Sequence, residues 1–250
     1  MKCVSCTASV GLVSILLGTF VQPSTSAETP AVSCLSGELK NLARLFNKDR
    51  FHEMFPEALE LYSFDGLISA ANKFSAFANS GNDSTNTLEL AAFLAQIAHE
   101  TDSLKAAEEY ARDDFSVWQY CDNTTVPCAP GRRYHGRGAI QISWNFNYNA
   151  AGKALGLDLL NNPDIVITNS TVAWMTALWY WMTPQKNGCV IHDVVTGVDG
   201  FALSTNIING EFECGPEAIN KENDLNRVVL FNGMCQELGV EALGKISCNA

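Results

Sequence analysis

Residues 87–101 read TLELAAFLAQIAHET. Alanine and leucine dominate this stretch, and both favour helices. Thr87 is a residue type that caps the first free N–H groups of a helix, so we expect the helix to begin there. Apolar residues lie on most faces, which predicts a buried helix. Its last turn carries His99 and Glu100, so a carboxyl group lies at the end of this buried helix.

Glu100 continues a stripe of apolar side chains along the predicted helix. Spacings of three, four and three residues place four side chains within roughly an 80° arc: Leu90, Phe93, Ile97 and Glu100. Burial disfavours the charged carboxylate, so we expect Glu100 to hold a proton near neutral pH, as a general acid must. The alternative is a glutamate that reaches solvent or a core arginine. The spacing alone favours this second interpretation.

The remaining pattern predicts one mostly helical domain. A second apolar segment, Val172 to Met182, contains three tryptophans and is followed by Pro184, which is typical of a core helix. Between the two helices, apolar residues from Ile140 to Tyr148 alternate with amide and hydroxyl residues. If this run is extended, it has one apolar and one amide-rich face.

The first 27 residues have the features of a signal peptide. Lys2 precedes an apolar run from Val10 to Val21, and Thr25-Ser26-Ala27 forms a small-residue exit. This run of about 12 residues is shorter than the roughly 20 that a spanning helix needs. We therefore expect residues 28–250 to form a single secreted, monomeric domain that does not contact a membrane after the signal is removed.

Charge and cysteine content narrow the function classes. Without Lys2, 15 of the 16 basic residues remain against 27 acidic ones, a net charge of −12, which disfavours nucleic acids and anionic membranes as partners. Seven cysteines follow the signal, which suggests three disulfides and one free thiol. Cys121 and Cys128 are close enough for a local bridge, and the other pairings stay open.

Glu100 needs a second carboxylate if the protein is a glycosidase. The candidates in the polar stretch after the helix are Glu108, Glu109, Asp113 and Asp114. A separation of roughly 6.5 to 9.5 Å between two carboxyl groups leaves room for a water molecule and gives inversion. The alternative is that these acids form a solvated surface, as most acidic clusters do.

Other kinds of chemistry have weaker support in the sequence. In a zinc protease helix a second histidine follows one turn after the first, but here Ser103 holds that position, so we predict no metal site and no cofactor. Gln141, Ser143 and Asn147 offer neutral donors and acceptors that bind sugar hydroxyls without ionic cost. From the pattern alone, a polar strand face is an equally good interpretation.

Four segments together resemble the family 19 glycoside hydrolases, the chitinases. They are Ala92 to Thr101, Tyr134 to Tyr148, Asn161-Asn162-Pro163-Asp164, and Thr205 to Gly210 followed by Glu213-Cys214-Gly215. The resemblance covers nearly all of the mature chain. It implies a mainly α, lysozyme-like, two-lobed domain with a small β-hairpin region and a central substrate cleft. The implied activity is endo-hydrolysis of β-1,4 links in chitin or chitooligosaccharides with inversion.

The resemblance also implies roles for particular residues. Glu100 matches the general acid. The chain is similar to the shorter, bacterial type, in which the base follows the acid by nine residues, so Glu109 matches the base with Glu108 as the alternative. Ser143 matches a serine that holds the attacking water, and Arg227 an arginine near the acid, with Glu213. The implied substrate-binding residues are Gln141, Asn147, Asn209, Tyr134 and Arg227.

The family resemblance orders the cysteines as Cys121 with Cys128 and Cys214 with Cys248. Cys34 with Cys189 is then the residual pair, and Cys235 is free and buried.

Several positions depart from the family pattern. Asp102-Ser103 stands where bacterial relatives have glycines, which predicts a different path for the loop that carries Glu109. His135 replaces a tyrosine, and Phe146 lacks a hydroxyl that a tyrosine would supply. The sequence has no cysteine-rich chitin-binding module, so we expect weak action on crystalline chitin. Two alternative functions stay open, a peptidoglycan-active cell-wall hydrolase and a catalytically inactive chitin-binding protein.

Overall fold

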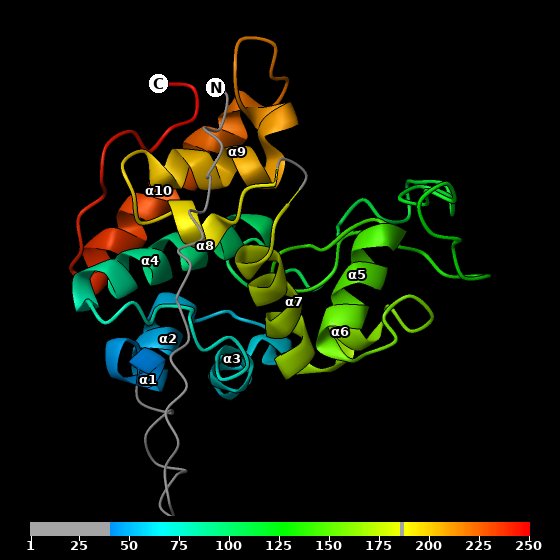
Figure 1. Ribbon diagram of the computed structural model, residues 1–250, viewed down its shortest axis with the longest axis horizontal. Coiled ribbons are helices and arrows are strands. Elements are labelled where there is room, and N and C mark those ends of the chain that lie inside the picture. The colour runs from blue at the N-terminus through cyan, green and yellow to red at the C-terminus, as the bar shows by residue number, and fades with distance from the viewer. Residues whose placement is uncertain (1–40, 186–187) are drawn as a thin grey trace, which may run out of the picture. The chain divides into compact units, whose positions relative to one another are not determined.

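The computed structural model of the chain describes residues 41–185 and 188–250. This part is mainly helical (Figure 1). Its β-structure consists of two isolated antiparallel bridges, one between Glu108 and Arg137 and one between Arg137 and Ile142. The predicted helical, lysozyme-like fold class is confirmed, and the predicted β-hairpin region is reduced to these bridges. The helices are α1 (Asn41–Leu45), α2 (Lys48–Met54), a 3-10 turn (Glu60–Tyr62), α3 (Phe64–Ala71), α4 (Asp83–Glu100), α5 (Asn145–Leu155), α6 (Ile165–Thr168), α7 (Ser170–Met182), α8 (Ile191–Val194), α9 (Gly200–Glu213) and α10 (Lys221–Leu238).

Helix α4 is the buried helix that the sequence predicts, but it begins earlier than expected. Its N-cap is Asn82, whose side chain accepts a 3.0 Å hydrogen bond from the Thr85 N–H. Thr87 lies inside the helix, where its hydroxyl donates to the Asp83 carbonyl at 2.7 Å, so the predicted Thr87 cap is wrong. Asparagine is a stronger capping residue than threonine, and a start at Asn82 makes the helix about one turn longer. The helix packs along α10 and also contacts α1.

An aromatic cluster joins α4 to α7. The ring of Phe93 lies 5.0 Å from Phe77 and 5.2 Å from Trp181, measured between centroids. Trp174 and Trp181 are fully buried, and α3 packs against the same helix. Edge-to-face contacts of this kind add stabilisation to that provided by the burial of apolar area alone. The predicted core helix over 172–182 is therefore confirmed.

A buried carboxylate satisfies the polar atoms of this cluster. Glu89 of α4 is 3% exposed and accepts hydrogen bonds from Trp181 Nε1 at 3.0 Å and from the Ala78 N–H at 2.9 Å. The Nδ1 atom of His192, at α8, lies 2.6 Å from the same carboxylate. A buried charge is tolerated when its oxygens are bonded in this way.

The segment from Ile140 to Tyr148 is not extended throughout. Helix α5 begins at Asn145, directly after Trp144, whose φ of 73° turns the chain. The buried side chains of α5 recur at helical spacing: Asn145, Tyr148, Ala151 and Gly152. The alternating interpretation is therefore wrong from residue 145 onward, because burial follows the 3.6-residue period there.

Two of the predicted disulfides, Cys121 with Cys128 and Cys214 with Cys248, are confirmed. Cys235 is free and buried, as expected. Cys34 and the predicted signal peptide lie outside the described residues, so the pairing of Cys34 with Cys189 stays a prediction. None of the helices in the described ranges is both long and apolar enough to cross a membrane.

Candidate active site

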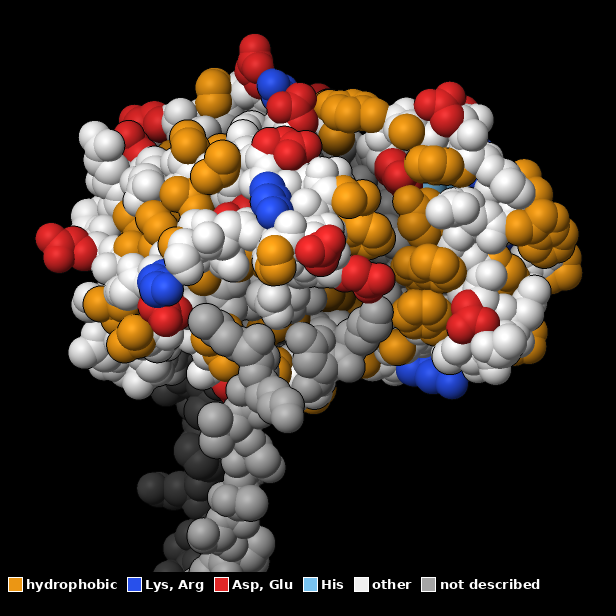
Figure 2. All heavy atoms as spheres, turned by 90° about the horizontal axis from the view of Figure 1, so that it is seen from above, with side chains coloured by type: hydrophobic (Ala, Val, Ile, Leu, Met, Phe, Trp, Pro, Cys, Tyr) orange, Lys and Arg blue, Asp and Glu red, His pale blue; other side chains and the backbone are white. Residues whose placement is uncertain are grey.

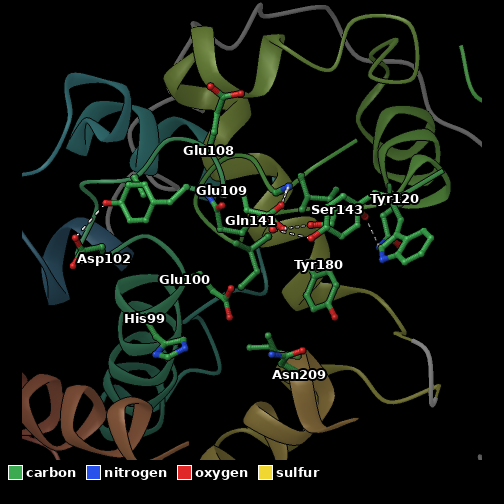
Figure 3. A pocket seen from close by; sticks show the side chains of 18 of the residues that line it. His99, Glu100, Asp102, Glu108, Glu109, Tyr120, Gln141, Ser143, Tyr180 and Asn209 are labelled. Carbon is green, nitrogen blue, oxygen red and sulfur yellow. Dashed lines mark hydrogen bonds between the residues drawn. The ribbon is translucent and has the colours of Figure 1, made fainter. Parts of the chain in front are cut away.

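A cavity of about 550 Å³ opens at the carboxyl end of α4 (Figures 2 and 3). Its walls come from the end of α4, the loop over 102–110, the segment over 136–147, Tyr180 of α7, and α9. Six of the eight predicted catalytic and substrate-binding residues line it: Glu100, Glu109, Gln141, Ser143, Asn147 and Asn209. The fold thus brings together residues that lie up to about a hundred positions apart in the sequence.

Glu100 is held from behind by Arg227 of α10. The guanidinium Nη2 lies 2.5 Å from Glu100 Oε1, and the Arg227 side chain is 1% exposed, whereas the Glu100 side chain is 17% exposed toward the cavity. The sequence offered an apolar stripe or a core arginine as the surroundings of Glu100. The structure contains both, because Glu100 follows the buried apolar residues of α4 and its carboxylate also forms an ion pair with Arg227.

Arg227 also binds a second, fully buried carboxylate. Its Nε donates to Glu213 Oε2 at 2.7 Å and its Nη1 donates to Gln96 Oε1 at 2.7 Å. Burial by itself lowers the pKa of Arg227, but the charges of Glu100 and Glu213 raise it well above its ordinary value. The guanidinium therefore stays charged, and one cation serves two acids.

Gln96 is a polar residue of this network that the sequence analysis missed. It is fully buried inside α4, and its Nε2 donates to the hydroxyls of Ser204 and Thr205 on α9 at 2.8 and 3.0 Å. The signal was present, since Gln96 is the one amide in the segment from Thr87 to Thr101 and a buried amide requires partners. Through Gln96, helix α4 fixes α9 as well as α10.

Asn209 lies at an irregularity in α9. Its backbone angles, φ −145° and ψ 28°, are non-helical and interrupt the helix. Its Nδ2 donates to Glu213 Oε1 at 2.7 Å, and its side chain also lines the cavity. Breaks of this kind within a helix often occur at functional sites, and here the break connects the cavity wall to the buried ion pair.

Glu109 reaches the cavity from the loop after α4. Its Oε1 accepts a 2.8 Å hydrogen bond from the Tyr120 hydroxyl, and its backbone N–H donates to the Gly136 carbonyl at 2.9 Å. Burial, the hydrogen bond to Glu109 and its charge all raise the pKa of Tyr120. The phenol therefore remains a donor to this carboxylate. Tyr120, which directly precedes Cys121, is a site residue that the sequence pattern did not predict.

Glu108 has different partners from its neighbour. Its Oε1 lies 2.8 Å from His135 Nε2 and 3.5 Å from Arg137 Nε, and its Oε2 lies 3.7 Å from Arg112 Nε. In Figure 3 its carboxylate points away from Glu100. His135 thus supplies a partner for this acid.

The loop between α4 and Glu109 keeps a left-handed backbone without glycine. Asp102, Ser103 and Leu104 have φ values of 50°, 59° and 66°. The Ser103 N–H donates to the Ala98 carbonyl at 2.7 Å, and Leu104 is fully buried. A left-handed conformation costs an ordinary residue roughly 1 kcal/mol, so local bonds and burial hold this turn in place.

The segment over 136–147 presents the predicted sugar-binding groups. Gln141 and Trp144 have positive φ values of 50° and 73°, and Ser143 lies between them with its hydroxyl bonded to the Gln141 carbonyl at 3.0 Å. Asn147 Nδ2 donates to the Ser143 carbonyl at 2.9 Å. Gly138 is required here, because a Cβ atom would lie 2.6 Å from Val166 Cγ1. Strained, closely packed backbone of this kind is common at functional sites.

Two predicted substrate-binding residues do not reach the cavity. Tyr134 is fully buried; its hydroxyl accepts from the Ala129 N–H at 2.9 Å and donates to the Leu160 carbonyl at 3.0 Å. Arg227 contacts the carboxylates instead of the open space. The polar atoms of both residues are bonded inside the core, so a role of these two in binding substrate stays a prediction.

The C-terminal residues brace the same buried acid. Asn249 Nδ2 donates to the Glu213 carbonyl at 2.8 Å, and Asn249 Oδ1 accepts from the Gly215 N–H at 2.8 Å. Asp224 of α10 is fully buried and accepts hydrogen bonds from the Ser247 hydroxyl, the Cys248 N–H and Asn249. We did not predict these contacts from the sequence, which gives no local signal for them.

Chemically, the cavity presents carboxyl groups, hydroxyls and amides. Within the described ranges, no group of three or more His, Cys, Asp or Glu residues has the geometry to hold a metal ion. Burial and the charge of Glu100 raise the pKa of Tyr180 to about 12, so its hydroxyl stays protonated beside that acid. The arrangement is suited to proton transfer and to binding a neutral, hydroxyl-rich ligand.

Comparison with known proteins identifies the family. The family model for class I chitinases matches residues 42–248. The chain is 39% identical over 256 residues to an endochitinase of Pisum sativum, which covers 90% of this chain and 78% of that protein. Its structure is similar to that of a bacterial family 19 chitinase (TM-score 0.73, 39% identity, 82% of this chain and 100% of the other) and to chitinase C from Streptomyces griseus HUT6037 (TM-score 0.76, 36% identity, 84% and 100%). The chain therefore belongs to the family 19 glycoside hydrolases, a family of chitinases.

Proposed function

We propose that the protein is a secreted endochitinase that cleaves β-1,4 links between N-acetylglucosamine units in one inverting step. Glu100 is the general acid and Glu109 the general base, and Ser143 helps to orient the attacking water. The observation that carries the proposal is that Glu100 at the end of α4 and Glu109 in the following loop line one cavity together with the amides of Gln141, Asn147 and Asn209; Asp102 and Glu108 are the other two acids in its wall. Relatives named endochitinases support the substrate class.

The charge arrangement supports Glu100 as the proton donor. Arg227 faces two acids, and Glu213 makes two of its bonds while fully buried. A buried carboxylate depends on its cation, so Arg227 neutralises Glu213 as well as contacting Glu100. Glu100 is the one of these two acids that lines the cavity, so it is the one that can reach the leaving oxygen.

The partners of the two neighbouring acids favour Glu109 over Glu108 as the base. Glu108 interacts with two arginines and a histidine, and Arg137 among them is 5% exposed in its side chain. Such an acid fixes the loop. The Glu109 carboxylate accepts hydrogen bonds from two neutral donors, the Tyr120 hydroxyl at 2.8 Å and the Gly136 N–H at 3.3 Å, and can accept a proton from water.

The test is hydrolysis of chitohexaose by three matched variants. Glu100→Gln is expected to lower kcat by about a hundredfold or more, because general acid catalysis contributes roughly 10² to 10⁴. Glu109→Gln is expected to lower kcat comparably, whereas Glu108→Gln is expected to lower thermal stability more than kcat. Full activity of Glu100→Gln contradicts the assignment, and a Glu108→Gln variant that is folded but inactive exchanges the roles of the two neighbours.

The stereochemistry is tested on the unmodified protein. Proton NMR of the first product is expected to show the α-anomer, since inversion delivers water to the opposite face of the anomeric carbon. An initial β-anomer contradicts the single-step mechanism. Comparing release of sugars from colloidal chitin with clearing of bacterial cell walls separates chitin from peptidoglycan as the substrate.

A further inference from the structure

The two isolated bridges connect the segments that carry the proposed base and the serine. Arg137 belongs to both bridges, since it pairs with Glu108 in one and with Ile142 in the other. Glu109 directly follows Glu108, and Ser143 directly follows Ile142. Both of these side chains line the cavity. The position of Arg137 relative to its two bridge partners therefore determines how far apart Glu109 and Ser143 lie.

Each bridge consists of few backbone hydrogen bonds. At the first, the Glu109 N–H donates to the Gly136 carbonyl and the Gly138 N–H donates to the Ala107 carbonyl, both at 2.9 Å. At the second, the two bonds between the paired residues are 3.3 and 3.0 Å long. Even an isolated two-stranded hairpin is only marginally stable in water, so bridges this short depend on side chains to hold them.

Side chains from both segments of the first bridge meet in a mostly buried cluster. The Nε2 atom of the buried His135 lies 2.8 Å from Glu108 Oε1. The buried guanidinium of Arg137 lies 3.0 Å from Asp164 Oδ1 and donates to the Tyr148 hydroxyl at 3.1 Å. The same hydroxyl donates to the His135 carbonyl at 2.8 Å. His135 is thus anchored to α5 through Tyr148, and its contact with Glu108 joins the loop to this anchored segment.

The contacts of His135 determine which of its ring nitrogens carries the proton. Its Nδ1 atom is buried and has no hydrogen-bond partner among the described residues. A proton on Nδ1 is a buried donor without an acceptor, so the neutral ring carries its proton on Nε2 and donates it to Glu108. Burial is the largest cause that lowers the pKa of His135, which favours the neutral ring. An apolar ring fills the same space without leaving a nitrogen unpaired, which indicates that the fold uses the Nε2 donor.

We propose that His135 is a positioning residue, which holds Glu108 by this hydrogen bond and so keeps Glu109 at the distance from Ser143 that the attacking water requires. The inference rests on the proposed function, in which Glu109 and Ser143 direct that water. His135 does not line the cavity, so it acts through the first bridge instead of touching substrate. Glu108 and Glu109 are neighbours, so a shift of one moves the other. A displacement of about 1 Å can cost about a hundredfold in rate, so a small movement of the loop is enough to lower kcat.

The experiment measures chitohexaose hydrolysis and thermal unfolding of matched variants. His135→Phe keeps a ring but removes the donor, and is expected to lower kcat about three- to thirtyfold with KM within about twofold, because no contact with bound substrate is lost. His135→Gln supplies an N–H donor in place of Nε2 and is expected to restore kcat to within about threefold of the unmodified protein. If His135→Phe does not fold, Glu108→Leu breaks the same hydrogen bond from the loop side and is expected to give the same loss of kcat.

His192→Phe is the matched control. His192 also pairs with a carboxylate, that of Glu89 at 2.6 Å, but it does not line the cavity or contact either bridge. This variant is expected to lower the midpoint of thermal unfolding without changing kcat at a temperature where it is folded. The inference is overturned if folded His135→Phe keeps full kcat, if His135→Gln loses as much as His135→Phe, or if His192→Phe shows an equal loss of kcat.

The same assay separates this inference from the proposed function. If Glu109→Gln is inactive while His135→Phe keeps full activity, the proposed function stands and the positioning role of His135 is refuted. If Glu109→Gln keeps full activity, the proposed base is wrong, and this inference fails with it whatever the His135 variants do. If Glu108→Gln, which keeps an acceptor for His135, is folded but inactive, Glu108 is the base and both proposals are overturned.

Discussion

Glu100 lies at the end of the 18-residue α4 and contacts an arginine that is 1% exposed, whereas Glu109 lies in a loop and contacts a partly exposed tyrosine. On the acid side, buried charges tie three helices together. On the base side, the pair between Glu108 and Arg112 is 3.7 Å long and partly exposed, and three residues in succession hold a left-handed backbone. The comparison indicates that the acid belongs to the rigid core, while the position of the base is set by local loop contacts.

The largest expected difference comes from removing one arginine on each side. Arg227→Met leaves Glu213 buried without its cation, which is expected to lower the free energy of unfolding by about 3–5 kcal/mol. Arg112→Met breaks a 3.7 Å pair whose arginine is 36% exposed, and is expected to cost less than about 1 kcal/mol. Urea denaturation of both variants measures the difference. Equal losses contradict the view that only the acid side is part of the core.

The two disulfides extend the same comparison. In the loop-entropy model, removing Cys214–Cys248, with a sequence separation of 34, is expected to cost about 4 kcal/mol, and removing Cys121–Cys128, with a separation of 7, about 2.5 kcal/mol. Loss of the first bridge also frees the residues that hold the Glu213 carbonyl, so kcat is expected to fall with it. Paired Cys→Ser variants, measured by thermal unfolding and chitohexaose hydrolysis, test both effects. A larger stability loss from the Cys121–Cys128 pair reverses the comparison.

The sequence predicts the acid side better than the base side for a physical reason. Glu100 and the helix that carries it follow from one periodic segment, and α7 follows from another. The contacts of Gln96, Asp224 and Asn249 join residues far apart in the chain, so no local pattern contains them. Only the buried amide of Gln96 gave a hint.

Errors at element boundaries have a similar origin. Asn82 and Thr87 are both capping residue types, and the helix is capped by Asn82, the stronger of the two. Residues 145–148 fit a two-residue period as well as a helical one, and the turn at Trp144 selects the helix. The base-side loop is predicted least well, because its left-handed turn lacks the glycines that normally signal one.

That turn gives a smaller test of how the loop is held. Ser103→Gly removes the steric cost of a left-handed residue but adds freedom to the unfolded chain, and is expected to stabilise the protein by up to about 1 kcal/mol. The matched control is Gly156→Ala at the end of α5, where φ is 69° and the expected change is a loss of about 1 kcal/mol. Chemical denaturation of both variants measures the two signs. Destabilisation by Ser103→Gly means that the serine side chain itself holds the loop.

The smallest expected effect is in the pH dependence of stability, where the pKa values of two histidines are shifted in opposite directions. The hydrogen bond to Glu89 raises the pKa of His192 above its ordinary 6.5, whereas burial lowers the pKa of His135 despite its contact with Glu108. The stabilisation from His192 is complete below pH 6.5 and is lost as the pH rises through the higher folded pKa. His135 instead disfavours the folded state at low pH, and this penalty disappears as the pH rises to 6.5.

Single variants separate the two contributions. The free energy of unfolding is measured from pH 5 to 8. Compared with the unmodified protein, His192→Gln is expected to lack the decrease in stability with rising pH that His192 causes. His135→Gln is expected to lack the increase in stability with rising pH that His135 causes. The first change reports on α4 and α8 in the core, and the second on the loop beside Glu108. If both variants change the pH slope in the same direction, the surroundings of the two carboxylates are not opposed in the way their contacts indicate.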